Sequence, residues 1–180
     1  MDSDGYLSQL ADIFNGITVN TPSISAIIAI VLAGVLLLAS GFASASEIAF
    51  FSLTPSERND IDEQNHPSDE KISALLGDSE RLLATILITN NFVNVTIIML
   101  CNFFFMNVFV FHSPLAEFLI LTVILTFLLL LFGEIMPKIY SAQKTLAFCR
   151  FSAPGIYFLE KLFRPVATVL VRSTTFLNKH

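Results

Sequence analysis

Charged residues are scarce in this chain, and long stretches contain none at all. Only 14% of the 180 residues are charged and 54% are hydrophobic, whereas an ordinary soluble domain has about 25% charged residues. A soluble protein of this size could not hide so much apolar surface, because a small domain leaves a large share of its surface in water. The composition therefore predicts an integral membrane protein, with residues 1–180 forming a single domain.

Three further shortages exclude other classes of protein. Two cysteines are too few for a disulfide-based scaffold. A net charge of −5 without any block of basic residues argues against nucleic-acid binding. Lys and Arg are absent before Arg58, so the N-terminal flank, with Asp2, Asp4 and Asp12, lacks the basic start of a cleaved signal peptide. The first apolar stretch is therefore expected to stay in the mature protein.

The charge-free stretches predict an all-α fold with three transmembrane helices, since one span needs about 20 mostly apolar residues. We place these spans at about residues 24–48, 82–105 and 115–137. The charge-free stretch that begins at Leu82 continues to Ala116 and is too long for one helix. Polar and turn-forming residues mark the expected turn within it, namely Asn107, His112, Ser113 and Pro114.

The basic residues predict the orientation of these spans. All ten Lys and Arg lie at or after Arg58, either in the segment 54–81 or from Lys138 onward. Basic residues are retained on the cytoplasmic side of a membrane. We therefore expect a multi-pass protein with its N-terminus outside and its C-terminus in the cytoplasm.

The segment 54–80 is predicted to form a cytoplasmic helical hairpin. Thr54-Pro55-Ser56-Glu57 combines a capping residue, a proline at the first helical position and a glutamate at the third, which together open a helix. His66-Pro67-Ser68 ends that helix, and a second helix continues to Gly77. The eight acidic residues of this region are interpreted as a solvated face, with recruitment of cations as the alternative.

The segment 142–177 is predicted to form amphipathic juxtamembrane helices on the inner membrane surface, with aromatic residues in the acyl boundary and basic residues towards anionic headgroups. Its apolar stretches are interrupted by charges, and Pro154 and Pro165 are expected to stop any continuous helix. A fourth span through 145–163 is the less favoured alternative.

Polar residues inside the predicted spans form three clusters, all in the cytoplasmic half of the membrane. They are Ser44, Ser46 and Glu47; Thr89, Asn90, Asn91 and Asn94; and Gly133, Glu134, Pro137 and Lys138. Pro137 has no N–H, which is expected to free the carbonyl four residues back, at Gly133. Polar residues are costly in lipid and usually face a partner or a cavity, so one shared site explains the common depth.

The oxygens of these clusters favour a hard cation. Hydroxyl, amide, carbonyl and carboxylate oxygens suit Mg²⁺, Ca²⁺ or Na⁺. Zinc and copper are disfavoured, because His66, His112 and His180 fall in loops or at the terminus. Three structural alternatives stay open. Ser and Asn can simply join helices, and Glu134 can be neutralised by Lys138, four residues away. Small residues can merely allow close helix approach, namely Gly34, Gly41, Ala43 and Ala45.

With these clusters in place, the chain resembles the transmembrane domain of the CorC/CNNM family of magnesium transporters. The likeness lies in Ser-x-Ser-Glu at 44–47, Thr-Asn-Asn with a further Asn at 89–94, and Gly-Glu-x-x-Pro-Lys at 133–138. The ordered set is more specific than any one motif, and it covers nearly the whole chain.

The resemblance implies a homodimer with three spans per subunit, in the inner membrane of a bacterium. It implies export of Mg²⁺ coupled to Na⁺ entry, with a largely dehydrated Mg²⁺ in the membrane. The metal site would comprise Ser44, Asn94, Gly133 and Glu134. Residues that support the metal ligands, or that bind the coupling ion, would be Ser46, Glu47, Asn90, Asn91, Pro137 and Lys138.

Family members usually continue into cytosolic CBS domains, which are expected to be absent from this chain. Two functions are therefore weighed: a transporter, and a dimeric anchor or sensor that serves cytosolic domains without transporting ions. An intramembrane enzyme is disfavoured, because neither His-Glu-x-x-His nor Gly-x-Ser-x-Gly occurs.

Overall fold

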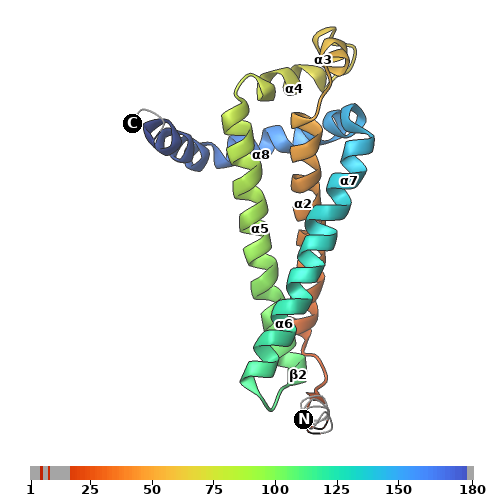
Figure 1. The fold of residues 1–180 in the computed structure, drawn as a ribbon, viewed down its shortest axis with the longest axis vertical. Helices are drawn as coiled ribbons and strands as arrows, with labels where there is room; N and C mark the ends of the chain where they lie inside the picture. The colour runs from red at the N-terminus through yellow and green to blue at the C-terminus, as the bar shows by residue number, and fades with distance from the viewer. Residues whose placement is uncertain (1–4, 6–7, 9–16, 178–180) are drawn as a thin grey trace.

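Three long helices run side by side along the molecule in the computed structural model, which describes Gly5, Ser8 and residues 17–177. Helix α2 spans Ile24–Phe51 and helix α5 spans Ser79–Val108. The third spans Pro114–Gln143 and joins α6 (Pro114–Leu128), the π-helix η1 (Leu129–Ile135) and α7 (Met136–Gln143) (Figure 1). Each is long and apolar enough to cross a membrane, which confirms the three predicted spans.

Local capping explains where several helices begin. Thr54 and Glu57 form the predicted capping box at the start of α3 (Pro55–Asp62), since each side chain accepts the other residue's backbone N–H. Asp78 caps α5 by accepting from the N–H of Arg81 at 3.2 Å. Ser113 caps α6, and a proline follows it at the first helical position.

A two-residue strand pair closes the end of the bundle opposite the hairpin. Strand β1 (Thr18–Val19) pairs antiparallel with β2 (Phe109–Val110), which lies in the turn between α5 and α6. The sequence predicted the turn but not these strands. Their ladder fixes the start of the described chain to that turn. The acidic residues Asp2, Asp4 and Asp12 and the terminal His180 lie outside the described residues.

The segment after the third span is one helix, α8 (Thr145–Leu177), so the expectation that prolines would break it was wrong. It runs crosswise to the spans rather than alongside them (Figure 1), and the described residues contain no fourth candidate span. Pro154 and Pro165 both lie on its exposed side, whereas Cys149, Ala153 and Ile156 are buried against the bundle. This packing offsets the cost of about 3 kcal/mol for a proline inside a helix.

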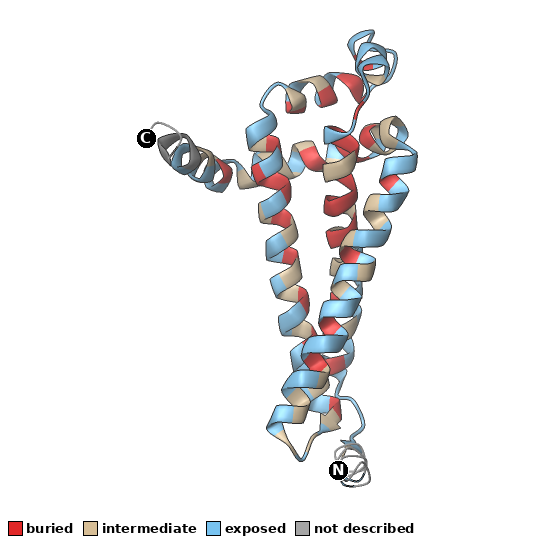
Figure 2. Cartoon of the chain, viewed as in Figure 1, coloured by how far each residue is buried: buried red, intermediate tan, exposed pale blue. Residues whose placement is uncertain are grey.

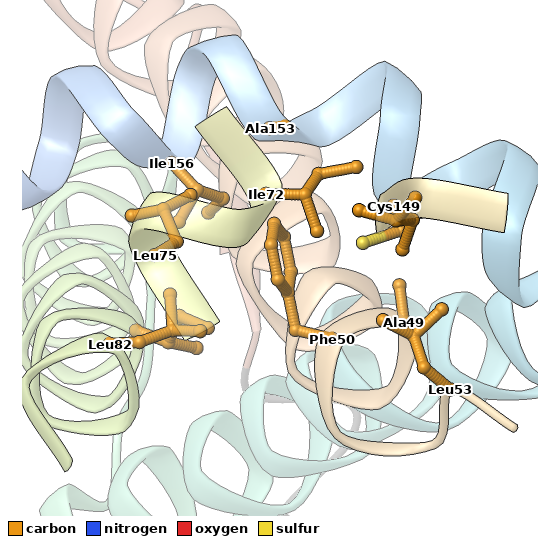
Figure 3. Packing of buried hydrophobic residues seen from close by; sticks show 11 residues of the cluster. Ala49, Phe50, Leu53, Ile72, Leu75, Leu82, Cys149, Ala153 and Ile156 are labelled. Carbon is orange, nitrogen blue, oxygen red and sulfur yellow. The ribbon is translucent and has the colours of Figure 1, made fainter. Parts of the chain in front are cut away.

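The largest buried cluster lies where α8 meets the hairpin of α3 and α4 (Asp69–Leu76). Phe50 from α2, Ile72 from α4, and Cys149 and Ile156 from α8 are all fully buried there (Figure 3). Buried residues are concentrated in this half of the bundle, whereas the other half of the third span is largely exposed (Figure 2). The hairpin is therefore a packed part of the domain rather than a loose loop.

One acid of the hairpin is not on a solvated face. Asp69 is fully buried, and its two oxygens accept from Arg150 of α8 at 2.8 and 3.0 Å. Burial alone would raise the pKa of Asp69, but the hydrogen bonds from Arg150 and from the His66 N–H outweigh it, so the pKa lies below its ordinary value. The interpretation of all eight acids as solvated is wrong at Asp69, whose partner lies 81 residues away.

Candidate metal centre

The polar residues of α2 and α5 meet at Ser40, which is fully buried. Its hydroxyl lies 2.9 Å from the side-chain oxygen of Asn90 and 2.7 Å from that of Asn94. Asn90 and Asn94 are one helical turn apart on α5, so their side chains share a face. Three oxygens from two spans therefore converge inside the predicted membrane region.

The single hydroxyl proton of Ser40 cannot serve both amide oxygens. A hydroxyl has one proton, so Ser40 can donate to only one of the two amide oxygens at a time. The second amide is left without the hydroxyl proton. Hydroxyl and amide oxygens are ligands that a hard cation takes, so a cation at this position would contact all three residues.

The third span approaches the same serine through Gly133. A Cβ atom added to Gly133 would lie 3.1 Å from the Ser40 hydroxyl oxygen, so a larger residue here would crowd the cluster. Gly133 is buried and belongs to the π-helical segment η1. Residues from all three spans are thus brought together.

The π-helix changes which backbone carbonyl lacks a donor. The N–H of Met136 bonds to the carbonyl of Leu131, five residues back, and Pro137 has no N–H. Phe132 is four residues before Met136 and five before Pro137, so its carbonyl receives a helical bond from neither. That oxygen lies 3.3 Å from a Cβ placed on Gly41 of α2. A π-segment of this kind is frequent at functional sites.

Ser44 lies one turn after Ser40 and is also fully buried. Its hydroxyl has no hydrogen-bond partner among the described residues. A buried polar atom without a partner costs free energy and calls for an explanation such as a bound ion or water. Ser44 thus has the free oxygen that the metal-site prediction requires of it.

Glu134 is half-buried and forms no hydrogen bond or ion pair within the described part of the chain. Lys138 pairs instead with Glu47, whose carboxylate oxygen lies 3.0 Å from the ammonium nitrogen. The alternative in which Lys138 neutralises Glu134 is therefore not the observed pairing. Glu134 therefore keeps a carboxylate without a partner among the described residues, one position after Gly133.

Other polar residues of the three motifs do not join the cluster. The Ser46 hydroxyl donates to the Phe42 carbonyl of its own helix at 2.7 Å, and Thr89 is occupied in the same way by Thr85. Asn91 is exposed on the outer side of α5. Ser46 and Thr89 therefore bond within their own helices and Asn91 faces outward, so none of the three contributes an oxygen to the cluster.

Sequence reasoning missed Ser40. Ser40 lies four residues before Ser44, so the helical repeat places both on one face of α2, and that spacing was the available signal. Gly41 allows α2 to approach Pro137, whose ring carbon would lie 3.0 Å from a Cβ on the glycine. Ser141 of α7 then donates to the carbonyl of Ala45 at 2.7 Å. These contacts hold the third span against α2.

The oxygens that the structure brings together around Ser40 are neutral hydroxyl and amide oxygens. Within the described residues, no three His, Cys, Asp or Glu side chains gather to hold a metal. A cation here would therefore depend on hydroxyl, amide and carbonyl oxygens, which suit Mg²⁺ and Na⁺ and not zinc.

The fold and this cluster define an α-helical membrane domain with three spans and a polar site between them. The chain belongs to the CorC/CNNM family, because residues 28–180 match the family described as the Cyclin M transmembrane N-terminal domain.

Two curated relatives support this assignment. A UPF0053 protein of Haemophilus influenzae is 31% identical over 134 residues, which are 74% of this chain and 31% of that protein. UPF0053 protein sll1254 of Synechocystis is 26% identical over 140 residues, which are 78% of this chain and 39% of that protein. The chain thus spans about a third of the length of these relatives.

Proposed function

We propose that this chain is the membrane domain of a Mg²⁺ transporter, and that the cluster around Ser40 binds the ion. The observation that carries the proposal is the placement of one serine hydroxyl between two amide oxygens. Membership of the CorC/CNNM family supports the same function.

The proposed ligands combine the sequence-based set with the residues that the structure adds. Ser44, Asn94, Glu134 and the backbone at Gly133 are retained, and Ser40 and Asn90 join them. The backbone oxygen without a helical donor is that of Phe132, one residue before Gly133. Mg²⁺ requires about six oxygens in a near-octahedral arrangement, with water supplying any that the protein lacks. A site with this many protein oxygens would strip most of the hydration shell, which is the proposed basis of selectivity.

Transport requires the site to open to each side in turn. The segment 129–137 is the proposed moving part, because its hydrogen bonds follow a non-ideal register and Pro137 leaves one carbonyl without a donor. Broken helices of this kind are tolerated in membranes where they line a cavity. We propose that Na⁺ entry drives Mg²⁺ efflux, and that the oxygens of the same region serve both ions. The proposal assigns the domain no catalytic chemistry.

The proposed assembly is a homodimer in a bacterial inner membrane, with the hairpin and α8 in the cytoplasm. The side chains of Asn91 and Asn102 are exposed on α5 at membrane depth, where polar groups usually face protein. A second subunit would cover such a face. In a longer protein, α8 would lead on to cytosolic CBS domains.

A flux experiment tests the proposal. The chain is reconstituted into proteoliposomes, and Mg²⁺ movement is measured with and without a Na⁺ gradient, alongside Mg²⁺ binding in the same preparation. Na⁺-dependent flux is expected in the wild type and should be lost in Glu134→Gln. Glu117→Gln is the matched control, because this glutamate lies in the first turn of α6 at the other end of the third span.

The rival function, a dimeric anchor or sensor without transport, gives a different pattern. It predicts no flux even where Mg²⁺ binding is intact. It also predicts that substitutions in the polar cluster lower the stability of the dimer without changing its preference among ions.

A further inference from the structure

A second polar site lies far from the proposed metal centre, where the α4–α5 turn meets α8. A cavity of about 220 Å³ is lined by three basic and two acidic side chains. They are Arg81, Lys161 and Arg164, with Asp78 and Glu160. The cavity is several times the volume of a water molecule, which occupies about 30 Å³, and its formal charge is positive.

Arg81 is half-buried in this site and is incompletely paired. One terminal nitrogen lies 3.4 Å from Asp78 and 3.9 Å from Glu160, which are long distances for ion pairs. Its Nε atom is buried and has no hydrogen-bond partner among the described residues. A guanidinium group has five N–H donors, so Arg81 has donors left over for another acceptor.

The remaining cations come from one face of α8. Tyr157, Glu160, Lys161 and Arg164 follow the helical spacing of three and four residues and all line the cavity. The Lys161 ammonium lies 5.5 Å from the centre of the Tyr157 ring. Both Lys161 and Arg164 are exposed, so their charged ends can reach a ligand in the cavity.

The position of the cavity identifies the kind of ligand. Arg81 is the last charged residue before the uncharged stretch that begins at Leu82, so the cavity lies at the boundary between membrane and water. Helix α8 crosses α5 close to the first turns of α5 (Figure 1). Beside the basic residues, α8 exposes Phe158 by 65% and Leu162 by 57%. A molecule that carries both a phosphate group and acyl chains matches this combination.

We propose that this cavity binds the phosphate group of an anionic phospholipid from the adjoining leaflet. Arg81 is the half-buried anchor, Lys161 and Arg164 close over the headgroup, and the acyl chains lie along the exposed apolar side of α8. Arginine is suited to this role because its planar donors match phosphate oxygens. The site fixes α8 to the lipid surface and does not depend on metal binding.

The test measures lipid binding to the chain in a neutral detergent, by native mass spectrometry and by thermal stabilisation. Phosphatidylglycerol is expected to bind and stabilise the protein, whereas phosphatidylcholine should bind much more weakly. Arg164→Gln and Lys161→Gln should each weaken phosphatidylglycerol binding about tenfold, as expected for the loss of one charge-assisted contact. Both residues are exposed, so neither substitution threatens folding.

Arg172→Gln is the matched control, because it removes the same charge from an exposed position of the same helix outside the cavity. It should leave lipid binding unchanged. Equal weakening in Arg172→Gln and Arg164→Gln would overturn the proposal, as would unchanged binding in both. Inorganic phosphate is the third arm: stabilisation by phosphate alone at the same concentration would show a site for the free anion and would also overturn it.

Discussion

Replacing Ser40 with alanine removes the one hydroxyl that lies between two amide oxygens. Ser46→Ala is a closely matched control. Both serines are fully buried on α2, but the Ser46 hydroxyl bonds only to its own helix, at the Phe42 carbonyl. Each substitution loses one hydrogen bond, so without Mg²⁺ we expect a similar loss of about 1 kcal/mol in the free energy of unfolding.

The two variants should separate when Mg²⁺ is added. A ligand at a hundred times its dissociation constant stabilises the folded state by about 2.7 kcal/mol. Changing a group that supports a metal site typically weakens binding about 10–100-fold. At the same Mg²⁺ concentration, stabilisation of Ser40→Ala should then fall to about 1.4 kcal/mol or less. Ser46→Ala should keep the full effect.

The assay is thermal unfolding of the detergent-solubilised chain across a Mg²⁺ titration, with the dissociation constant taken from the shift in Tm. Full Mg²⁺ stabilisation in Ser40→Ala would show that its hydroxyl does not contribute to the site. An equal loss in Ser46→Ala would show that any buried hydroxyl of α2 has the same effect, and the reasoning from geometry would fail.

Three further predictions concern the packing around the site and the hairpin. Asp69→Ala should lower the free energy of unfolding by about 3 kcal/mol, as measured by chemical denaturation. This is the lower end for breaking a buried ion pair, because Arg150 remains partly hydrated. The double variant Asp69→Leu/Arg150→Met should recover the stability, and a failure to recover would contradict a purely local effect. The pKa of Asp69 is lowered in the folded state, so the ion pair stabilises the protein fully at neutral pH and this stabilisation is lost as the pH falls through the lowered pKa. The Tm of Asp69→Asn should therefore depend less on pH in acid than the Tm of the wild type. Parallel curves of Tm against pH for the two proteins would refute the assignment. Gly41→Ala should lower the free energy of unfolding by about 1 kcal/mol, because the added Cβ would meet Pro137 at 3.0 Å. Gly34→Ala is the control: its Cβ would meet nothing within 4 Å, so it should raise the free energy of unfolding by up to about 1 kcal/mol. Equal Tm values for the two variants would show that the contact of Gly41 with Pro137 does not limit the residue at position 41.

The features that sequence predicts well are those set by local chemistry. The three spans follow from the cost of charge in lipid, which leaves long charge-free stretches. The start of α3 follows from the contacts of Thr54 with Glu57, only three residues apart.

The features that sequence missed depend on partners distant in the chain. The continuity of α8 through Pro154 is set by its packing against α2 and the hairpin, which no local pattern reveals. The burial of Asp69 depends on Arg150. The four-residue spacing of Ser40 from Ser44 indicates a shared face of α2, but only the position of α5 shows that Ser40 meets Asn90 and Asn94.

The central claim is that the oxygens around Ser40 and Asn94 bind a divalent cation. Mn²⁺ prefers the same octahedral oxygen environment as Mg²⁺, and it can be located in crystals of the chain by its anomalous scattering. The account predicts one strong peak between α2, α5 and η1, within coordinating distance of the Asn94 side-chain oxygen. A peak only among the acids of the hairpin, with none at Asn94, would contradict it.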